Sequence, residues 1–248
     1  MKRKIDTTLK LRHKPKRFVP AEEPFPSEAQ AAFQRLVKDF AFPCIGAKAA
    51  LNSGAISYGF YDRLGADVST KNLARDLERF TLTSSTQSEN QLATMIAVFR
   101  GPFDLTELEF EKLLWSQLQK LHECDAEQSA WDDRVSSDPN ASDFWFSFAR
   151  QAYYVIGMHA NSSREARRFP WPTLVFNPHE QFERLRSEGN WERMKQTIRS
   201  RDFALQGSVN PMLSDFGETS EARQYSGRAV EETWQAPFVS SGKCPFGH

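Results

Sequence analysis

The chain has 248 residues, a formal net charge of zero, 40% apolar residues and 26% charged residues. This length and composition suit a globular protein with a sizeable core, and they exclude a chain that is disordered throughout. Because no apolar run approaches the length of a membrane span and no apolar segment begins the chain, we expect neither a transmembrane helix nor a secretory signal.

Residues 1–24 form a basic arm that we expect to be disordered. Residues 1–18 contain eight Lys and Arg residues against Asp6. Such a run can tether a protein to nucleic acid or to a membrane surface, but a solvated terminus is the plainer interpretation. Nucleic acid is an improbable partner because the arm lacks the interleaved aromatic residues that bind single strands.

The chain from 25 to 238 is expected to form a single domain, followed by a tail at 239–248. Apolar periodicity predicts helices at 28–40 after an N-cap at Ser27, at 73–80, from 104 or 106 to 122, at 180–186 and at 191–198. Apolar β-type runs predict strands at 56–61, 92–99, 153–158 and 172–177. Strands and helices without strict alternation indicate the α+β class, with a central, mostly antiparallel sheet packed with helices.

Residues 42–51 are small and apolar, and contain Cys44. Small side chains permit either close contact with a flat ligand or tight helix packing. Cys44 could be a thiolate ligand, although a lone cysteine among apolar residues is more often inert. Together with Cys124 and Cys244 it forms no CxxC pair, which favours a reducing, cytoplasmic location.

Two histidines stand at the ends of predicted strands. His159 ends the run YYVIGM, and His179 follows the strand at 172–177 and Pro178. Neutral imidazole is a common transition-metal ligand, although a satisfied structural histidine is the more frequent case. No zinc, hydrolase or kinase motif is present, so an axial haem ligand is the chemistry left open.

Three stretches carry a resemblance to a known family. The strings GMHANSSREARRFPWPTLVFNPHEQFERLR and IRSRDFALQGSVNPMLSDFGETSEARQYSGR, with FPCIGAKAAL upstream, resemble the YqcI/YcgG family. That family includes haem-dependent enzymes of the guanitoxin-biosynthesis type, which hydroxylate guanidine nitrogens. The resemblance implies haem b with a histidine ligand, O2 as co-substrate and an external reductase or chemical electron donor. The sequence departs from the family at Ala236, where a cysteine is usual, which argues against a terminal cysteine ligand unless Cys244 substitutes.

We therefore expect a haem-dependent N-oxygenase of a guanidine- or arginine-like compound; the alternative is a non-enzymatic haem carrier or gas sensor. His159 is expected to bind the iron, because a rigid strand precedes it and small residues follow. His179 and Glu180 are expected at catalytic positions, and Glu180, Asp215 and Glu221 are candidates to bind the substrate cation. Propionate contacts are expected from Arg164, Arg168, Arg201 and Arg228.

Overall fold

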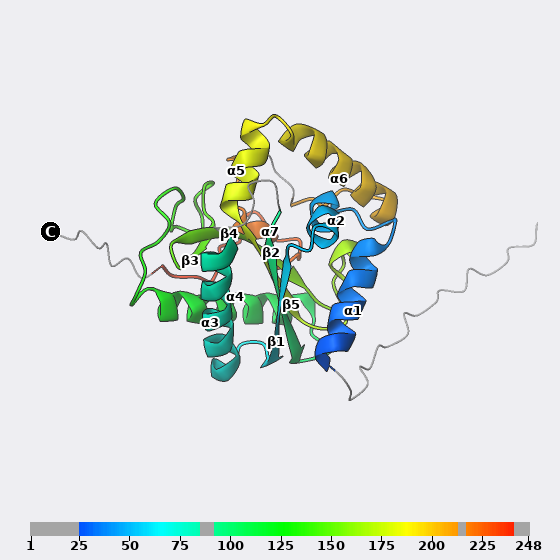
Figure 1. Ribbon diagram of the computed structural model, residues 1–248. Coiled ribbons are helices and arrows are strands. Elements are labelled where there is room, and N and C mark those ends of the chain that lie inside the picture. Colours follow the sequence, from blue (N-terminus) through cyan, green and yellow to red (C-terminus); the bar gives the residue numbers. More distant parts are fainter. Residues whose placement is uncertain (1–24, 85–91, 213–216, 241–248) are drawn as a thin grey trace, which may run out of the picture.

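A five-stranded mixed sheet organises the protein, whose computed structural model describes residues 25–84, 92–212 and 217–240 (Figure 1). The sheet has the order β1-β2-β5-β4-β3. Its β1–β2 pair is parallel and its other three pairs are antiparallel. The expected α+β class with a mostly antiparallel sheet is confirmed. The strands are β1 (Ile56–Arg63), β2 (Thr94–Gly101), β3 (Phe146–Phe148), β4 (Gln151–Met158) and β5 (Thr173–Pro178).

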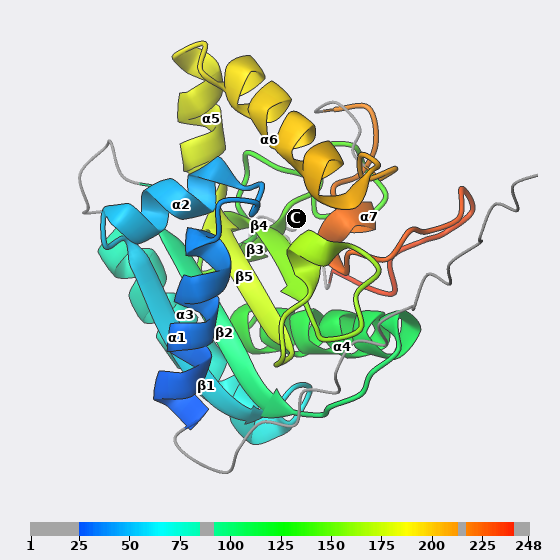
Figure 2. The same ribbon diagram turned by 90° about the vertical axis from the view of Figure 1, so that its right-hand side faces the viewer.

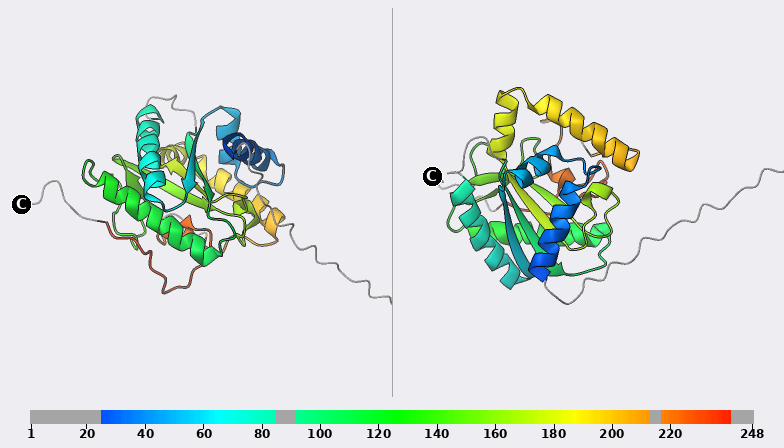
Figure 3. Two further views of the ribbon diagram at one scale, coloured as in Figure 1. Left: turned by 90° about the horizontal axis from the view of Figure 1, so that it is seen from below. Right: turned by 45° about the vertical axis from the view of Figure 1, so that its right-hand side comes forward.

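Helices cover both faces of this sheet. Helices α1 (Phe25–Lys38) and α2 (Ile45–Asn52) lie on one face, and α3 (Asp67–Ser84) and α4 (Glu107–Asp125) lie on the other (Figures 2 and 3). Helices α5 (His179–Ser187) and α6 (Trp191–Gln206) extend beyond the end of the sheet at which β5 finishes. The 3₁₀ turn η1 (Glu165–Arg167) and the one-turn helix α7 (Ala222–Tyr225) complete the described elements.

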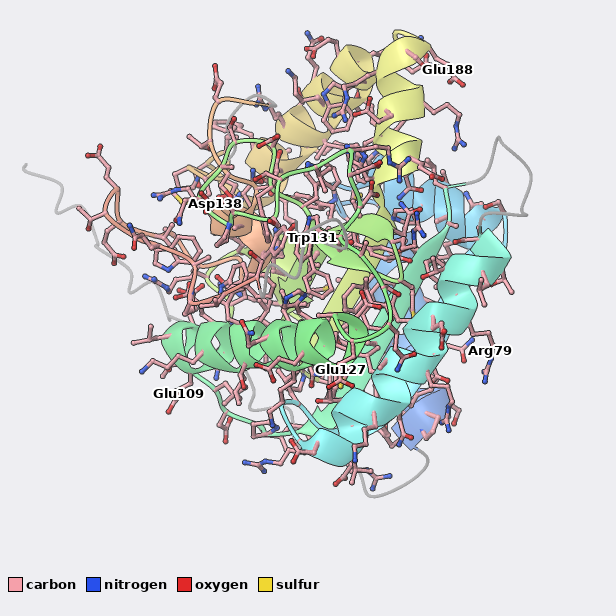
Figure 4. The ribbon with its side chains drawn as sticks, turned by 90° about the vertical axis from the view of Figure 1, so that its left-hand side faces the viewer. Arg79, Glu109, Glu127, Trp131, Asp138 and Glu188 are labelled. Carbon is pink, nitrogen blue, oxygen red and sulfur yellow. The ribbon has the colours of Figure 1, made fainter. Side chains whose placement is uncertain are left out.

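Local chemistry explains where several helices begin. The Thr106 side chain accepts the Glu109 amide and the Glu109 carboxylate accepts the Thr106 amide, so a capping box starts α4 at one of the two predicted positions, 104 or 106. The expected N-cap at Ser27 is wrong, because α1 already begins at Phe25, whose ring packs edge-on against Phe60. Figure 4 shows the α3/α4 side, with Arg79 on the outward face of α3 and Glu109 near the start of α4.

Two apolar cores follow from the alternation of side chains along the strands. Tyr153 and Val155 pack with α3 and α4 in one core, and Ile96 and Val175 pack with α1 in the other. On the α1/α2 side, however, Tyr154, Ile156 and Asn177 are only half-buried, although β4 and β5 lie inside the sheet. This face is therefore incompletely covered at one end.

The ends of the chain fall outside this description. The expected arm at 1–24 and most of the tail, residues 241–248, lie outside the described residues. Across 25–84, 92–212 and 217–240, no helix has both the length and the apolar character needed to cross a bilayer.

Candidate functional site

The two histidines lie at opposite ends of the β4–β5 pair. His159 follows Met158, which pairs with Thr173 at the start of β5, whereas His179 follows Pro178, which pairs with Tyr153 near the start of β4. Strands rise about 3.3 Å per residue, so a separation of seven residues along the pair puts the two histidines roughly 23 Å apart. The structure does not bring them into one site.

His159 is enclosed by the α3/α4 core. Its side chain is 2% exposed, and its ring stacks on Phe110 with centroids 4.4 Å apart. Burial lowers the pKa of His159 to about 4, and Glu107 opposes that shift only in part. Its Nδ1 is buried without a hydrogen-bond partner. The ring is therefore neutral and has a nitrogen free for a ligand, but the packing leaves little space beside it.

His179 begins α5, as expected, and has different surroundings. Its Nε2 lies 3.2 Å from Glu183 Oε1, and its ring meets Trp145 edge-on at 4.4 Å. Burial lowers its pKa, so this ring is also held neutral. Its neighbour Glu180 is exposed and pairs with Arg134 at 3.0 Å. Of the two residues expected at catalytic positions, the one enclosed by protein is His179.

Arg164 and Arg228 already bind buried carboxylates. Arg164 pairs with Asp202 and also donates to the Ser208 carbonyl at 3.0 Å. Arg228 makes two bonds of 3.0 Å to Glu111, which is 4% exposed. Each guanidinium group forms an ion pair with a carboxylate from a distant part of the chain. Neither arginine can therefore bind a propionate without breaking an ion pair that stabilises the fold.

Arg168 and Arg201 bind backbone carbonyls. Arg168 donates from Nε to the Ser162 carbonyl at 2.8 Å. Arg201 donates to the Phe40 carbonyl and lies over the Phe40 ring, 5.5 Å from its centroid. The four arginines expected to contact propionates therefore do not converge on one place.

The fit to haem is accordingly partial. His159 has the charge state and the unpartnered nitrogen that an iron ligand needs. The arginines, in contrast, do not form a set that could hold two propionates. Within the described ranges, no group of three His, Cys, Asp or Glu residues could hold a bare metal ion.

A chain of hydrogen bonds links β4 to α7. Tyr154 Oη donates to Gln224 Oε1 at 3.0 Å, and Gln224 Nε2 donates to Glu221 Oε2 at 2.7 Å. Glu221 is only 9% exposed, and burial raises its pKa to about 7, against a smaller opposite effect of Arg186. None of the ion pairs in the described part of the chain includes Glu221. We call Tyr154, Gln224 and Glu221 the Tyr154 cluster.

Aromatic rings surround the tyrosine of this cluster. Trp145, Tyr225 and Phe182 lie 5.6, 5.8 and 5.9 Å from the Tyr154 ring, centroid to centroid. Since Trp145 also contacts His179, the structure brings His179 and Glu221 to the same end of the fold. A buried carboxyl group near aromatic rings suits a planar organic cation, which can combine an ion pair with ring contacts.

Arg167 also lies beside Tyr154: burial raises the pKa of Tyr154, and Arg167 opposes that shift. Its Nη1 donates to the carbonyls of Gly157 and Tyr225, each at 3.2 Å. Burial lowers its pKa, and none of the described ion pairs includes it. Cys44 lies near enough to act on the pKa of both Arg167 and Tyr154. Its sulfur accepts the Ala47 amide and caps α2, and burial raises the pKa of its thiol.

Sequence reasoning identified Glu221 but missed its partners. Asp215, another carboxylate candidate, lies outside the described residues. Tyr154 and Gln224 carry no local motif, and their meeting depends on two segments 70 positions apart. Of the two interpretations of residues 42–51, the packing one is supported, since a Cβ at Gly46 would lie 3.2 Å from Met194 Cε of α6.

Comparisons with known proteins agree on one family. The model of the YqcI/YcgG family matches residues 33–239. The uncharacterized protein YqcI of Bacillus subtilis (strain 168) is 28% identical over 212 residues, which cover 82% of each chain. No solved structure matches.

Proposed function

Because the chain belongs to the YqcI/YcgG family, we propose that it is a haem-dependent N-oxygenase of a guanidine- or arginine-like compound. The haem part of this proposal rests on the resemblance of the sequence motifs to haem-dependent members of the family. The substrate part rests on Glu221, a buried carboxyl group that takes part in none of the ion pairs among the described residues and feels only a minor effect of Arg186. A guanidinium ion can meet such a group with two parallel N–H bonds.

The reaction is the insertion of one oxygen atom into an N–H bond. When bound, haem supplies the activation of O2. One oxygen atom of O2 enters the product as N–OH, and the other leaves as water. Two electrons and two protons from an external donor complete the balance.

The residues of the Tyr154 cluster have separate roles in this proposal. A bound guanidinium favours the charged form of Glu221, and so lowers its pKa from about 7 and keeps the carboxylate ionised at neutral pH. Gln224 fixes one carboxylate oxygen through its amide, at 2.7 Å, and Tyr154 holds that glutamine in turn. The other carboxylate oxygen then remains for the substrate.

His159 is the residue proposed to hold the iron, because it follows the interior strand β4 directly and its ring is neutral with an unpartnered Nδ1. His179 also has a neutral ring and an unpartnered Nδ1, so the position at the end of the strand is what favours His159. A haem at that ring requires the side chains around it to move, since His159 is 2% exposed. His179 has a neutral ring and lies close to the Tyr154 cluster through Trp145. It is therefore proposed to assist at the substrate rather than at the iron.

The test is an absorption spectrum of full-length protein expressed with a haem supply, followed by turnover with a chemical reductant and O2. A Soret band and an N-hydroxylated product, detected by mass spectrometry, are expected. Haem content is then compared between His159→Ala and His179→Ala, each purified as folded protein. Loss of the band in the second variant alone would refute His159 as ligand. A Soret band without product from any guanidine compound would favour a carrier or gas sensor.

A further inference from the structure

The two edge strands of the sheet differ in how they resist pairing with a further strand. An open edge presents unpaired N–H and C=O groups, and proteins limit such pairing with short edge strands, proline, lysine or bulges. Strand β3, at one edge, has three residues, whereas β1, at the other edge, has eight. Strand β1 contains neither Pro nor Lys, and its register with β2 keeps one offset from Ile56↔Thr94 to Tyr61↔Phe99. None of the usual devices therefore protects the edge of β1.

The hydrogen-bond ladder determines which backbone groups of β1 face outward. Thr94 pairs with Ile56 and its amide donates to the Ala55 carbonyl at 3.1 Å, so the odd-numbered residues of β1 bond to β2. The N–H and C=O groups of Ile56, Tyr58 and Phe60 consequently point away from β2. Within the described ranges, no hydrogen bond outside the sheet uses the backbone of these three residues. They form an open edge that a second strand can bind.

Two aromatic rings lie beside this open edge. The rings of Tyr58 and Phe60 stack with centroids 6.1 Å apart, and both side chains are half-buried. Helix α1 holds them from one side, because Phe33 meets Tyr58 edge-on at 6.1 Å and Phe25 meets Phe60 edge-on at 5.9 Å. Figure 2 shows β1 at the margin of the sheet, with α1 in front of it and α3 behind. Partly exposed apolar surface therefore accompanies the unpaired backbone groups.

We propose that the edge of β1 is a homodimer interface, at which two copies of the chain pair antiparallel and join their sheets. A two-fold axis at Tyr58 gives the register that uses all three outward residues. Tyr58 then faces the partner's Tyr58, and Ile56 faces the partner's Phe60. Aromatic and β-branched side chains that face each other across two strands stabilise the pairing.

The charges near this edge favour a second copy over a charged partner. Residues 56–61 contain no charged side chain, so two copies meet without repulsion and a charged strand finds no complement. Beside them, Tyr61 Oη donates to Asp76 of α3, which lies 3.6 Å from Arg79 and 3.9 Å from Arg75. The two-fold axis places α3 next to its own copy, so acidic and basic groups are present on both sides.

The first test is sedimentation velocity on the full-length protein. Because three outward residues make a small interface, we expect a dimer of twice 28.4 kDa with a Kd on the order of micromolar. Tyr58→Pro removes an outward N–H that β2 does not bind, and should weaken the dimer at least about tenfold. Phe203→Ser, the control, removes a 57% exposed aromatic side chain from α6 and should leave the Kd unchanged. A wild type that is monomeric at about 100 μM, or a dimer that only Phe203→Ser weakens, would overturn the proposal.

Residue-resolved hydrogen exchange on the wild type tests the same edge without any substitution. The amides of Ser57, Gly59 and Tyr61 bond to β2 and should exchange slowly at every protein concentration. The amides of Tyr58 and Phe60 should exchange slowly in the dimer and rapidly after dilution to the monomer. Slow exchange of these two amides in the monomer would show that another segment of the same chain covers the edge, and rapid exchange in the dimer would place the interface elsewhere. Either result would overturn the proposal.

Disulfide formation tests the position of the axis. Tyr58→Cys and Phe60→Cys are each made in a Cys124→Ser, Cys244→Ser background and oxidised with glutathione. Paired residues have Cα atoms about 5.5 Å apart, within the range of a disulfide, so Tyr58→Cys should form a covalent dimer. The two copies of Phe60 lie about 13 Å apart along the strands in this register, so Phe60→Cys should stay uncrosslinked. Any other outcome would overturn the axis at Tyr58.

Discussion

Replacing Arg228 with glutamine should destabilise the fold strongly, because the guanidinium neutralises a buried carboxylate. Arg228 binds both oxygens of Glu111 at 3.0 Å. The Glu111 side chain is 5% exposed and that of Arg228 is 16% exposed, so water screens this pair little. Breaking a buried ion pair by removing one partner costs about 3–5 kcal/mol. Ser226 Oγ at 3.0 Å and Trp234 Nε1 at 3.3 Å still donate to Glu111, so we expect about 3 kcal/mol.

The measurement is the free energy of unfolding in urea at pH 7, followed by tryptophan fluorescence and circular dichroism. Arg193→Gln is the matched control and should change this free energy by less than about 0.5 kcal/mol, because Arg193 is exposed on α6. The double variant Arg228→Gln, Glu111→Gln should recover part of the loss, because no unpaired charge remains. A loss below about 1 kcal/mol in Arg228→Gln would refute the structural role and make Arg228 a propionate candidate again.

Three further predictions concern buried groups. Burial holds the pKa of His159 at about 4, below its usual 6.5, so the unfolded chain binds a proton there more readily than the folded protein. The free energy of unfolding is therefore highest above pH 6.5 and falls by roughly 3 kcal/mol as the pH falls toward 4. Unfolding free energies at pH 7 and pH 4.5 should therefore differ less in His159→Gln than in the wild type. Burial raises the pKa of Glu221 from 4.5 to about 7, so the folded protein favours the protonated carboxyl group. The stability that this gives to the fold is fully present below pH 4.5 and is lost as the pH rises through 7. Glu221→Gln should remove that dependence, and a dependence that persists in the variant would assign it to another group. Gly157→Ala would place a Cβ 2.6 Å from Phe110 and 2.9 Å from the Tyr225 carbonyl, so we expect a loss of about 1–3 kcal/mol and a lower Tm, and an unchanged Tm would contradict the packing.

The elements with strong local signals were predictable from the sequence. The capping box at Thr106 marks the start of α4, and the apolar runs around Val155 and Val175 form the expected strands. Helix α3 is longer than the expected 73–80, because its first turn contains the buried polar residues Ser69 and Thr70 instead of an apolar stripe. Strand β3 was missed, since it has three residues and depends on a bond from the Phe146 amide to Tyr225 Oη.

The candidate site was less predictable, because its residues meet only through tertiary structure. Glu221 was one of three carboxylates that the sequence could not rank, and its enclosure by the fold is what separates it from exposed Glu180. Arg167 and Arg168 are adjacent in the chain, but Arg167 is half-buried and its guanidinium binds two carbonyl groups, whereas Arg168 is exposed. Spacing alone could not tell them apart, because the 3₁₀ turn η1 and the C-terminal end of α7 decide which of the two guanidinium groups points into the protein.

The order of strands in the sheet affects how the protein folds during its synthesis on the ribosome. Strand β5 lies between β2 and β4, and the Thr94 hydroxyl donates to the Phe176 carbonyl across 82 positions. Trp234 then donates to Glu111 across 123 positions, and Tyr225 packs on Trp115. Contacts so distant in sequence slow folding. A chain emerging from the ribosome therefore keeps the edge of β2 and the surface of α4 open until its C-terminal segment is synthesised, which makes this protein sensitive to aggregation during translation and intolerant of C-terminal truncation.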